Sequence, residues 1–458
     1  MRVRSRSNVL FSGVEVRPLQ LEIEKLIYGG DGLARMPADE QGRGKTVFVP
    51  FVLPGEQVEV SLIESRPGFA RAQLEKVVTP SPDRVGPDCP YFGGCGGCHY
   101  QHINYEVQLR QKAGILRETL RRTAKLELEQ EIQLHPSPPW NYRNRTRMHV
   151  RHTPEFTLGF NRHNSHEVLA VEACPISSPL INQAIAAVWP LGRGGAVPEI
   201  VHGLQFFANH DDTQLLVEAY VWPGDNAAEL QPLAAALRSA LPAVAGVVIF
   251  PASSIEDESQ ERALRAFHHP EIAPAIGGNC LMYHAVGQPY RVSGGSFFQT
   301  NRHLVDTLAQ VATANHGGRA ALDLYAGVGL FTLPLARAFD QVLAVESSQD
   351  SLADLRCNVP ANVECTHATT ETFLAERGSQ LTPDLVLVDP PRAGLGEKTA
   401  AALGRMSVSH VTYVSCDPAT LARDLRLLLE SGFRVEQAHL VDMFPQTFHL
   451  ETVLHLAR

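Results

Sequence analysis

The sequence predicts an α/β protein of three parts: a small β-barrel, a mixed α+β middle domain, and a C-terminal domain built on a doubly wound parallel sheet. After residue 291, short apolar strands alternate with helices, which is the pattern of a parallel sheet. Residues 17–80 contain short strands of alternating polarity, and residues 81–290 mix strands with an alanine-rich helix. We therefore expect the domains to span 17–80, 81–290 and 291–458.

Composition is that of a globular protein, with 458 residues of which 44% are hydrophobic and 19% charged. No apolar run reaches membrane-spanning length, and Arg2, Arg4 and Arg6 lie where a signal peptide would be apolar. We expect a cytoplasmic protein without a membrane partner. Residues 1–150 hold 21 Lys and Arg against 17 Asp and Glu, and the remainder holds 19 against 32. A polyanionic partner should therefore meet the N-terminal part first.

The N-terminal strands carry a recognisable turn and strand pair. The segments are LEIEKLIYGGDGLARM, KTVFVPFVLPGEQVEVSLIES and FARAQLEKVV, separated by turn residues. The GGDGLAR turn and the VFVPFVLPGEQVEV strand pair resemble a TRAM domain, an RNA-binding barrel of the OB type. Barrels of this kind bind oligonucleotides or act as spacers.

Three cysteines lie within ten residues, in CPYFGGCGGCHYQH, as Cys89, Cys95 and Cys98. Cysteines so close in a glycine loop can hold one metal centre, and Cys174 in EACPIS is the best candidate for a fourth ligand. Spacing does not separate tetrahedral zinc from an iron–sulfur cluster. Covalent haem attachment through Cys-x-x-Cys-His is disfavoured because no targeting signal is present, and a thioredoxin-like pair is disfavoured because no βαβ pattern surrounds it.

Two basic stretches follow the cysteine motif. The segment NYEVQLRQKAGILRETLRRTAKLEL, residues 104–128, predicts a helix whose outer face carries Arg110, Lys112, Arg117, Arg121 and Arg122. Next, WNYRNRTRMHVRH interleaves aromatic residues with arginines: Trp140, Tyr142, Arg143, Arg145, Arg147 and Arg151. Such a stretch suits single-stranded or looped RNA, although arginines on a solvent-facing edge strand would look similar.

The C-terminal third contains a nucleotide-type turn. In ALDLYAGVGLFTLPLAR a strand leads through Gly327 and Gly329 into a helix, and the next strand, QVLAVESS, ends in Glu346, which is placed to hold ribose hydroxyls. The turn lacks the full Gly-x-Gly-x-x-Gly pattern, which disfavours NAD. Together with Asp389 in DLVLVDPPRAGL, the motif resembles the S-adenosylmethionine site of class I (Rossmann-like) methyltransferases.

A nucleophile and a base are predicted at neighbouring strand ends. Cys416 follows the apolar run HVTYVS and precedes Asp417-Pro418, a helix-start signal. A helix N-terminus favours a thiolate, although a buried structural cysteine is the alternative. Glu451 lies among apolar residues in HLETVLHL, where a carboxylate is costly unless it is paired, exposed or functional.

Taken in order, SGGSFFQTN, DLYAGVGLFTLPLA, DPPRAGL, VSCDPATLARDL and FPQTFHLETV resemble the RNA uridine-C5 methyltransferase family, together with the barrel and the cysteine motif. The resemblance implies S-adenosylmethionine contacts at Gln299, Tyr325, Glu346 and Asp389, a nucleophile at Cys416 and a base at Glu451. It also implies a [4Fe-4S] cluster held by Cys89, Cys95, Cys98 and Cys174, as in the family members that act on 23S ribosomal RNA.

The expected activity is therefore S-adenosylmethionine-dependent methylation of carbon 5 of a uridine in RNA, most simply 23S rRNA, with no stable protein partner. Three alternatives stay open. They are a transfer-RNA target, a class I methyltransferase acting on another substrate, and an iron–sulfur RNA-binding protein with a silent methyltransferase site. The sequence does not identify the uridine, the number of sites or the oligomeric state.

Overall fold

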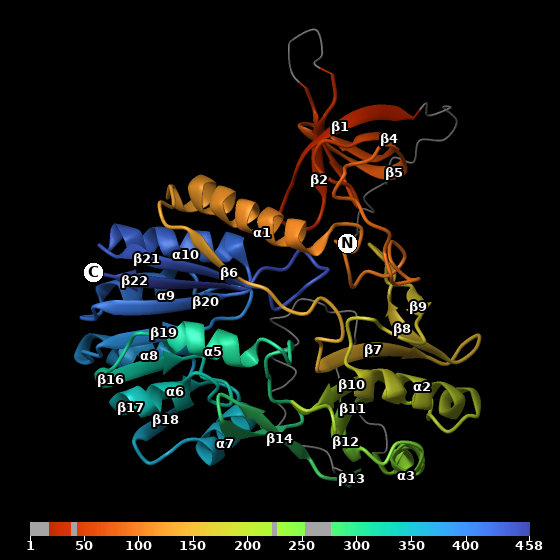
Figure 1. Ribbon diagram of the computed structural model, residues 1–458. Coiled ribbons are helices and arrows are strands. Elements are labelled where there is room, and N and C mark those ends of the chain that lie inside the picture. Colours follow the sequence, from red (N-terminus) through yellow and green to blue (C-terminus); the bar gives the residue numbers. More distant parts are fainter. Residues whose placement is uncertain (1–17, 38–43, 222–226, 252–275) are drawn as a thin grey trace, which may run out of the picture. The chain divides into compact units, whose positions relative to one another are not determined.

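Figure 1 shows the computed structural model of the chain, in which residues 18–37, 44–221, 227–251 and 276–458 are described. The chain separates into two compact units, one of residues 1–86 with 102–104 and the other of residues 87–101 with 105–458. Each unit has its own core. Residues 87–101 and 105–290, which the sequence assigns to a middle domain, lie in the same unit as the C-terminal residues.

The first unit is a closed barrel with the strand order β1-β2-β3-β5-β4. Its strands are β1 (Leu19–Leu26), β2 (Gly32–Arg35), β3 (Thr46–Val49), β4 (Gln57–Arg66) and β5 (Phe69–Thr79). Alternate side chains on each strand point inward, and Ile23, Val47 and Val60 are among those that fill the core. The predicted N-terminal barrel is confirmed.

The second unit contains an eight-stranded sheet in the order β18-β17-β16-β19-β20-β22-β21-β6. Strands β16 to β20 run parallel, as predicted, whereas β22 is antiparallel to β20 and β21. The bounds are β6 (Ile132–His135), β16 (Gly318–Leu324), β17 (Phe339–Glu346), β18 (Val363–His367), β19 (Leu385–Val388), β20 (His410–Ser415), β21 (Arg434–Val441) and β22 (Thr452–Ala457). The edge strand β6 comes from residues far earlier in the chain.

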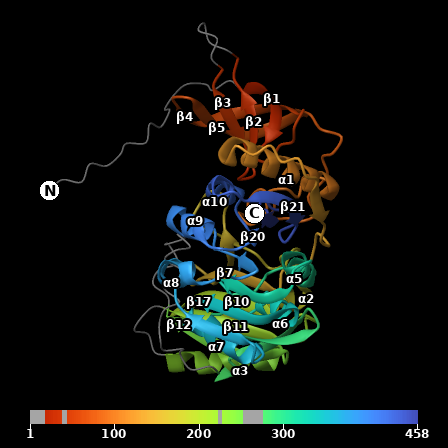
Figure 2. The same ribbon diagram turned by 90° about the vertical axis from the view of Figure 1, so that its left-hand side faces the viewer.

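Helices cover both faces of this sheet, which makes it doubly wound. Figure 2 shows α8 (Thr370–Arg377), α9 (Glu397–Arg405) and α10 (Pro418–Glu430) on one face and α5 (Val305–Thr313) and α6 (Thr332–Ala338) on the other. The remaining helical segments at this sheet are α7 (Gln349–Asn358), η3 (Gly378–Gln380) and α1 (Tyr105–Thr119), which continues as η1 (Leu120–Ala124). Figures 1 and 2 both place α1 beside α10 near β21.

A second sheet of seven strands has the order β13-β12-β11-β10-β7-β8-β9. Its strands are β7 (Arg145–Arg151), β8 (Thr157–Asn161), β9 (Val168–Ala170), β10 (Val201–Ala208), β11 (Leu215–Val221), β12 (Val244–Pro251) and β13 (Ile276–Gly277). The core beneath it includes side chains of α2 (Pro179–Arg193) and α3 (Gln231–Ala240), which follows η2 (Ala227–Leu230). The hairpin of β14 (Cys280–Ala285) and β15 (Gln288–Ser293) leads into the C-terminal sheet.

Two predicted helices differ from the structure in their extent. The first α-helix ends at Thr119, and Lys125 adopts a left-handed conformation with φ of 58° that closes the following turn. The helix expected from Asn301 begins at Val305. None of the helices in the described parts of the chain is long and apolar enough to cross a membrane.

Candidate active site

The predicted cofactor residues are neighbours because β16, β17 and β19 end in register. Leu324 at the end of β16 pairs with the residue before Glu346 and with the residue before Asp389. Tyr325, Glu346 and Asp389 therefore lie next to one another at the carboxyl edge of the sheet, where open α/β sheets bind ligands. Tyr325 has a φ of 63°, an unusual conformation for a non-glycine residue that marks a sharp departure from the strand.

The glycine turn after β16 leaves open space beside an acidic side chain. Gly327 has a φ of 57°, and no atom lies within 4 Å of the position where a Cβ would stand. The Glu346 carboxylate accepts hydrogen bonds from the backbone N–H of Gly327 at 2.8 Å and of Ser348 at 2.6 Å. Gly329, with a φ of 97°, lies where a Cβ would come within 2.9 Å of the Leu355 side chain. These contacts fix the turn against the end of β17.

Gln299 is brought to the same edge by the loop after β15. Its Nε2 donates to Asp389 Oδ2 over 3.5 Å. The loop is fixed by the buried carboxylate of Asp354 on α7, which accepts from the backbone N–H and hydroxyl of Ser293 and from the hydroxyl of Ser296, each at 2.7 Å. A buried acceptor with three donors holds a loop firmly.

Two aspartates beneath the site hold protons more tightly than usual. Burial raises the pKa of Asp323, in β16, to about 7. A hydrogen bond from the Thr332 hydroxyl lowers this pKa, and the charge of Glu346 raises it. Burial and the neighbouring Asp323 likewise raise the pKa of Asp389 to about 7. The second oxygen of Asp323 is buried and has no hydrogen-bond partner among the described residues. Asp323 lies within the glycine motif ALDLYAGVGL, but the sequence alone indicates no separate role for it.

Cys416 lies directly after β20, as predicted, but the helix N-terminus behind it is already occupied. The Asp417 side chain accepts from the backbone N–H groups of Ala419 and Thr420, each at 2.9 Å. Burial raises the pKa of the Cys416 thiol well above its usual range, and the charges of Glu451 and Asp389 raise it further. Contrary to the expectation from the sequence, the helix N-terminus therefore does not keep the Cys416 thiol ionised: burial raises the pKa most, and the Asp417 carboxylate, which occupies that end of the helix, adds a smaller rise.

Glu451 lies across the sheet edge from Cys416. Ser415 in β20 pairs with Thr452 in β22, so the residues just beyond this pair, Cys416 and Glu451, emerge on the same side of the sheet. The Glu451 side chain is 3% exposed. Burial and the charge of Asp389 raise its pKa well above the usual range, and the charge of Arg392 opposes this. A buried carboxyl group with raised proton affinity suits general acid–base chemistry.

Arg392 and His449 also lie at the site, although the sequence alone indicates no role for either residue. Arg392 Nη2 donates to His449 Nε2 over 3.3 Å, and its positive charge lowers the pKa of the Cys416 thiol and of Glu451. Burial, followed by the charge of Arg392, lowers the pKa of His449 to about 2, so its imidazole is neutral. Both residues occur in quoted motifs, Arg392 in DPPRAGL and His449 in FPQTFHLETV, which was the available signal.

The four cysteines of the predicted cluster lie near one another. Cys98 is buried, and Cys89, Cys95 and Cys174 are half-buried. Burial raises the pKa of Cys95 to about 11, and the charges of Cys174 and Cys89 raise it further. Burial and the charges of the other three thiols raise the pKa of Cys98. Neighbouring thiols with raised pKa values become thiolates when a positive centre, such as a metal, balances their negative charges. Within residues 18–37, 44–221, 227–251 and 276–458, no group of three or more His, Cys, Asp or Glu residues is arranged to hold a single metal ion.

Part of the predicted RNA-binding stretch is unavailable to RNA. Tyr142 is fully buried and donates through its hydroxyl to the carbonyl of Pro445 at 3.0 Å. Arg145 is buried with its guanidinium 4.2 Å from the centre of the Phe207 ring and donates to the Ser296 carbonyl. Lys112, predicted on the outer face of its helix, is also fully buried. These three assignments are corrected, because each polar group finds a partner in a segment distant in sequence.

Fold and site together define an α/β enzyme of the class I methyltransferase type with a separate N-terminal barrel. The model of the tRNA (uracil-5-)-methyltransferase family matches residues 285–458, and that of the TRAM domain matches residues 15–74. The chain belongs to the RNA uracil-C5 methyltransferase family.

Its relatives cover nearly the whole length of the chain. An RNA methyltransferase of Aquifex aeolicus is 32% identical over 95% of this chain and 98% of its own. The 23S rRNA (uracil(1939)-C(5))-methyltransferase RlmD of Alkalilimnicola ehrlichii is 32% identical over 95% and 96%, respectively. The crystal structure of the Pyrococcus abyssi tRNA (uracil-54, C5)-methyltransferase in complex with S-adenosyl-L-homocysteine shares the fold. Its TM-score is 0.73 at 24% identity, covering 95% of this chain and 99% of that one.

Proposed function

We propose that the protein methylates carbon 5 of a specific uridine in RNA with S-adenosylmethionine as the methyl donor, through a covalent bond between Cys416 and carbon 6 of the uracil. One observation carries the proposal. Cys416 directly follows Ser415 and Glu451 directly precedes Thr452, and Ser415 and Thr452 pair across β20 and β22. A half-buried thiol and a buried carboxyl group therefore share one edge with the glycine turn and Asp389. Family membership makes RNA uracil the expected substrate.

The methyl donor would be held by the residues that the strand register gathers: Gln299, Tyr325, Gly327, Gly329, Glu346 and Asp389. The open space at Gly327 and the acceptor at the end of β17 fit a nucleoside whose ribose lies along the turn. The carboxyl groups of Asp389 and Glu451, whose pKa values are raised, also fit a cationic ligand, because a sulfonium would favour their charged forms. When bound, the donor supplies an electrophilic methyl group.

The side chains at this edge can perform the remaining chemistry. Carbon 5 of uracil is a weak nucleophile, so the half-buried Cys416 thiol first gives its proton to water and its sulfur adds to carbon 6, moving electrons onto the carbonyl oxygen at carbon 4. Carbon 5 then takes the methyl group, and S-adenosylhomocysteine leaves. The Glu451 carboxylate removes the proton from carbon 5, and the bond between sulfur and carbon 6 breaks. The thiolate is regenerated and the ring double bond restored.

The RNA target is proposed from the relatives. Those named as RlmD act on uracil 1939 of 23S rRNA, and they match this chain over almost its full length. A 23S rRNA uridine is therefore the first target to examine, with a transfer-RNA uridine as the alternative. The target base must leave any stack to reach the half-buried Cys416 thiol, which suits a loop in RNA. We place the activity in the cytoplasm and propose no stable protein partner.

We also propose that Cys89, Cys95, Cys98 and Cys174 bind a [4Fe-4S] cluster. In such a cluster each thiolate binds a different iron atom, so the sulfurs need not converge on one point as they do around a single ion. The charge of each thiolate would raise the pKa of its neighbours, which requires the four cysteines to lie near one another, and this proximity supports the proposal. Anaerobic purification followed by iron and acid-labile sulfide analysis tests it. A colourless protein that carries zinc would contradict it.

Trapping with RNA that contains 5-fluorouridine tests the covalent step. The base can remove a proton from carbon 5 but cannot remove fluorine from it, so the last step is blocked. The adduct through Cys416 should therefore persist and survive denaturation. Cys416→Ala should abolish it, and Cys365→Ala, which removes a half-buried thiol from β18, should not. A Cys416→Ala protein that still methylates RNA would point to a class I methyltransferase without a covalent step.

Mapping 5-methyluridine in total RNA, with and without the gene, identifies the target. We expect one or more 23S rRNA positions to lose the modification when the gene is removed. Loss confined to transfer RNA would favour the alternative target. No measurable binding of S-adenosylmethionine by calorimetry would favour a silent methyltransferase site and contradict the proposal.

A further inference from the structure

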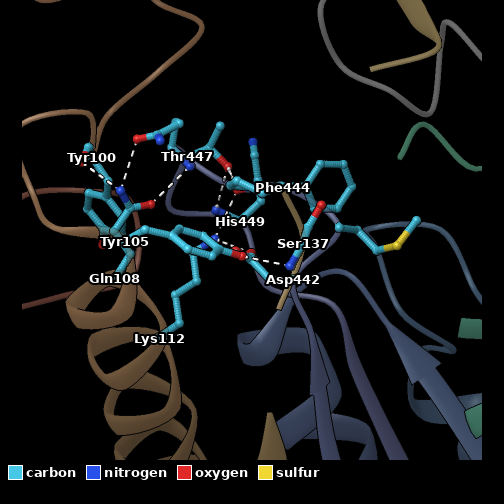
Figure 3. A network of polar contacts seen from close by, with 12 residues as sticks. Tyr100, Tyr105, Gln108, Lys112, Ser137, Asp442, Phe444, Thr447 and His449 are labelled. Carbon is cyan, nitrogen blue, oxygen red and sulfur yellow. Dashed lines mark hydrogen bonds and ion pairs between the residues drawn. The ribbon is translucent and has the colours of Figure 1, made fainter. Parts of the chain in front are cut away.

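The loop that leads into Glu451 is fixed by an unusual set of contacts. We call residues 442–450, which connect β21 to Glu451, the base loop. The polar groups of the base loop form hydrogen bonds mainly with residues 99–142 and with the loop that carries Gln299. They form few hydrogen bonds with the two strands that the base loop connects. Figure 3 shows Tyr105, Gln108 and Lys112 of α1 projecting toward it.

A buried ion pair fixes the beginning of the base loop. Lys112 Nζ lies 2.6 Å from Asp442 Oδ1, and both side chains are fully inaccessible to solvent. Lys112 also donates to the carbonyl of Phe444 at 2.9 Å, and the Tyr105 hydroxyl donates to Asp442 Oδ2 at 2.9 Å. The backbone N–H of Ser137 in turn donates to the Tyr105 hydroxyl. Every oxygen of the Asp442 carboxylate therefore has a donor.

A second clamp fixes the middle of the loop. Gln108 Nε2 donates to Gln446 Oε1 at 2.9 Å, and Gln108 Oε1 accepts from the backbone N–H of Gln446 at 3.0 Å. The carbonyl of Gln446 accepts from the backbone N–H groups of His99 and Tyr100, both at 2.9 Å, directly after Cys98. Gln446 has a φ of 68°, a strained conformation for a residue with a Cβ, which persists only where surrounding contacts impose it.

These contacts are a costly way to stabilise a fold. Removing two charges from water often costs as much as their attraction returns, so a buried ion pair contributes more to the choice of one conformation than to stability. Tyr105, Gln108 and Lys112 follow one another at spacings of three and four and thus lie on one face of α1. That face determines the path of the base loop, which ends at the side chain that must meet carbon 5 of the uracil.

We propose that Gln108 and Lys112 of α1, with Tyr105, are positioning residues for the general base: by fixing the base loop they place the Glu451 carboxylate for proton removal. The inference rests on the proposed role of Glu451. It assigns these residues no part in RNA binding or in bond formation by Cys416. The backbone bonds from His99 and Tyr100 extend the same support to the segment that follows the cysteine motif.

The test separates the step before the base acts from the step that needs it. Full-length Gln108→Met, Lys112→Met and Glu451→Gln are compared with the wild type on the mapped target RNA and on its 5-fluorouridine counterpart. With 5-fluorouridine the adduct forms without the base, so we expect the two α1 variants to form it within threefold of the wild-type rate. On uridine RNA their kcat should fall at least tenfold, KM should change less than threefold, and methylated adduct should accumulate as in Glu451→Gln.

Arg110→Met, on the exposed face of the same helix, controls for loss of a positive charge and should keep the wild-type kcat. If Lys112→Met does not fold because Asp442 is left unpaired, Gln108→Met, which leaves no unpaired charge, decides the outcome. Equal losses in adduct formation and turnover would overturn the inference, as would wild-type turnover in Gln108→Met. Normal turnover in Glu451→Gln would instead refute the proposed base, so the two failures are distinguishable.

Discussion

We expect the Cys416 thiol to be protonated in the ligand-free protein and to become reactive when a positive charge enters the site. Burial raises its pKa first, and the charges of Glu451 and Asp389 add to this, while Arg392 opposes them. The Asp417 carboxylate occupies the helix N-terminus that would otherwise favour the thiolate. A sulfonium methyl donor brings the missing positive charge, whereas its product, a thioether, does not.

The expected magnitude follows from the charge. Each unit of pKa changes the thiolate fraction about tenfold at a pH below the pKa, equivalent to about 1.4 kcal/mol. An opposite charge within roughly 4–6 Å lowers a pKa by about 1–3 units. At pH 7.5 the thiolate fraction of Cys416 should therefore be about ten- to a thousandfold higher with S-adenosylmethionine bound than with S-adenosylhomocysteine bound.

Alkylation by iodoacetamide between pH 6.5 and 10 measures this, with peptide mass spectrometry to follow Cys416 and the exposed Cys357 as an internal reference. Because both ligands occupy the same volume to within a methyl group, steric protection is matched between them. A ligand-free midpoint at or below the usual value of about 8.5 would refute the structural argument. Coincident profiles with the two ligands would refute the role assigned to charge.

Three further outcomes are expected. Asp417→Ser keeps a capping oxygen and removes a charge beside Cys416, so the alkylation midpoint should fall while the free energy of unfolding changes by less than about 1 kcal/mol. Burial and the neighbouring His135 lower the pKa of His439 from 6.5 to about 4, so its stabilising effect is complete above pH 6.5 and lost as the pH falls toward 4. His439→Gln should therefore remove about 2 kcal/mol of the difference in urea-unfolding free energy between pH 7 and pH 5. Phe297 is 58% exposed beside Gln299, so Phe297→Ala should raise the KM for RNA by about tenfold, as expected for loss of base stacking, without changing the unfolding midpoint.

Most of the candidate site residues could be proposed from the sequence because they lie at or just beyond strand ends, which have strong local signals, whereas Gln299 lies in a loop. Cys416 follows a β-branched apolar run and precedes Asp-Pro, and Glu346 closes another apolar run, so both positions follow from local pattern. The register of the parallel strands then brings the ends of these strands to the same edge of the sheet. The antiparallel pairing of β22 with β20, which brings Glu451 opposite Cys416, depends on long-range topology and is not encoded in either segment alone.

The wrong assignments of solvent-facing residues share one physical cause, which is a polar side chain whose partner is distant in sequence. Lys112 looks like a solvated lysine until Asp442, 330 residues away, is placed beside it. Arg145 looks like an RNA contact until the Phe207 ring lies beneath its guanidinium. A weak signal existed for Lys112, since Gln108 and Lys112 share a helical stripe with the buried Leu116. Polar residues at core-facing positions imply a buried partner without identifying it.

This pattern bears on how the catalytic edge is built. Cys416 and the residues proposed to hold the methyl donor, apart from Gln299, lie at or just beyond the ends of strands whose neighbours follow closely in sequence, so the last third of the chain suffices to arrange them. The proposed base, Glu451, directly precedes the antiparallel strand β22 and follows the base loop, which bonds little to the two strands that it connects. Strand β6 and helix α1, both from before residue 140, provide the missing support: β6 pairs with β21 at the start of the base loop, and α1 bonds the loop itself. In the proposed mechanism, forming the covalent bond and resolving it would therefore depend on different parts of the chain, which is why substitutions in α1 should separate the two steps.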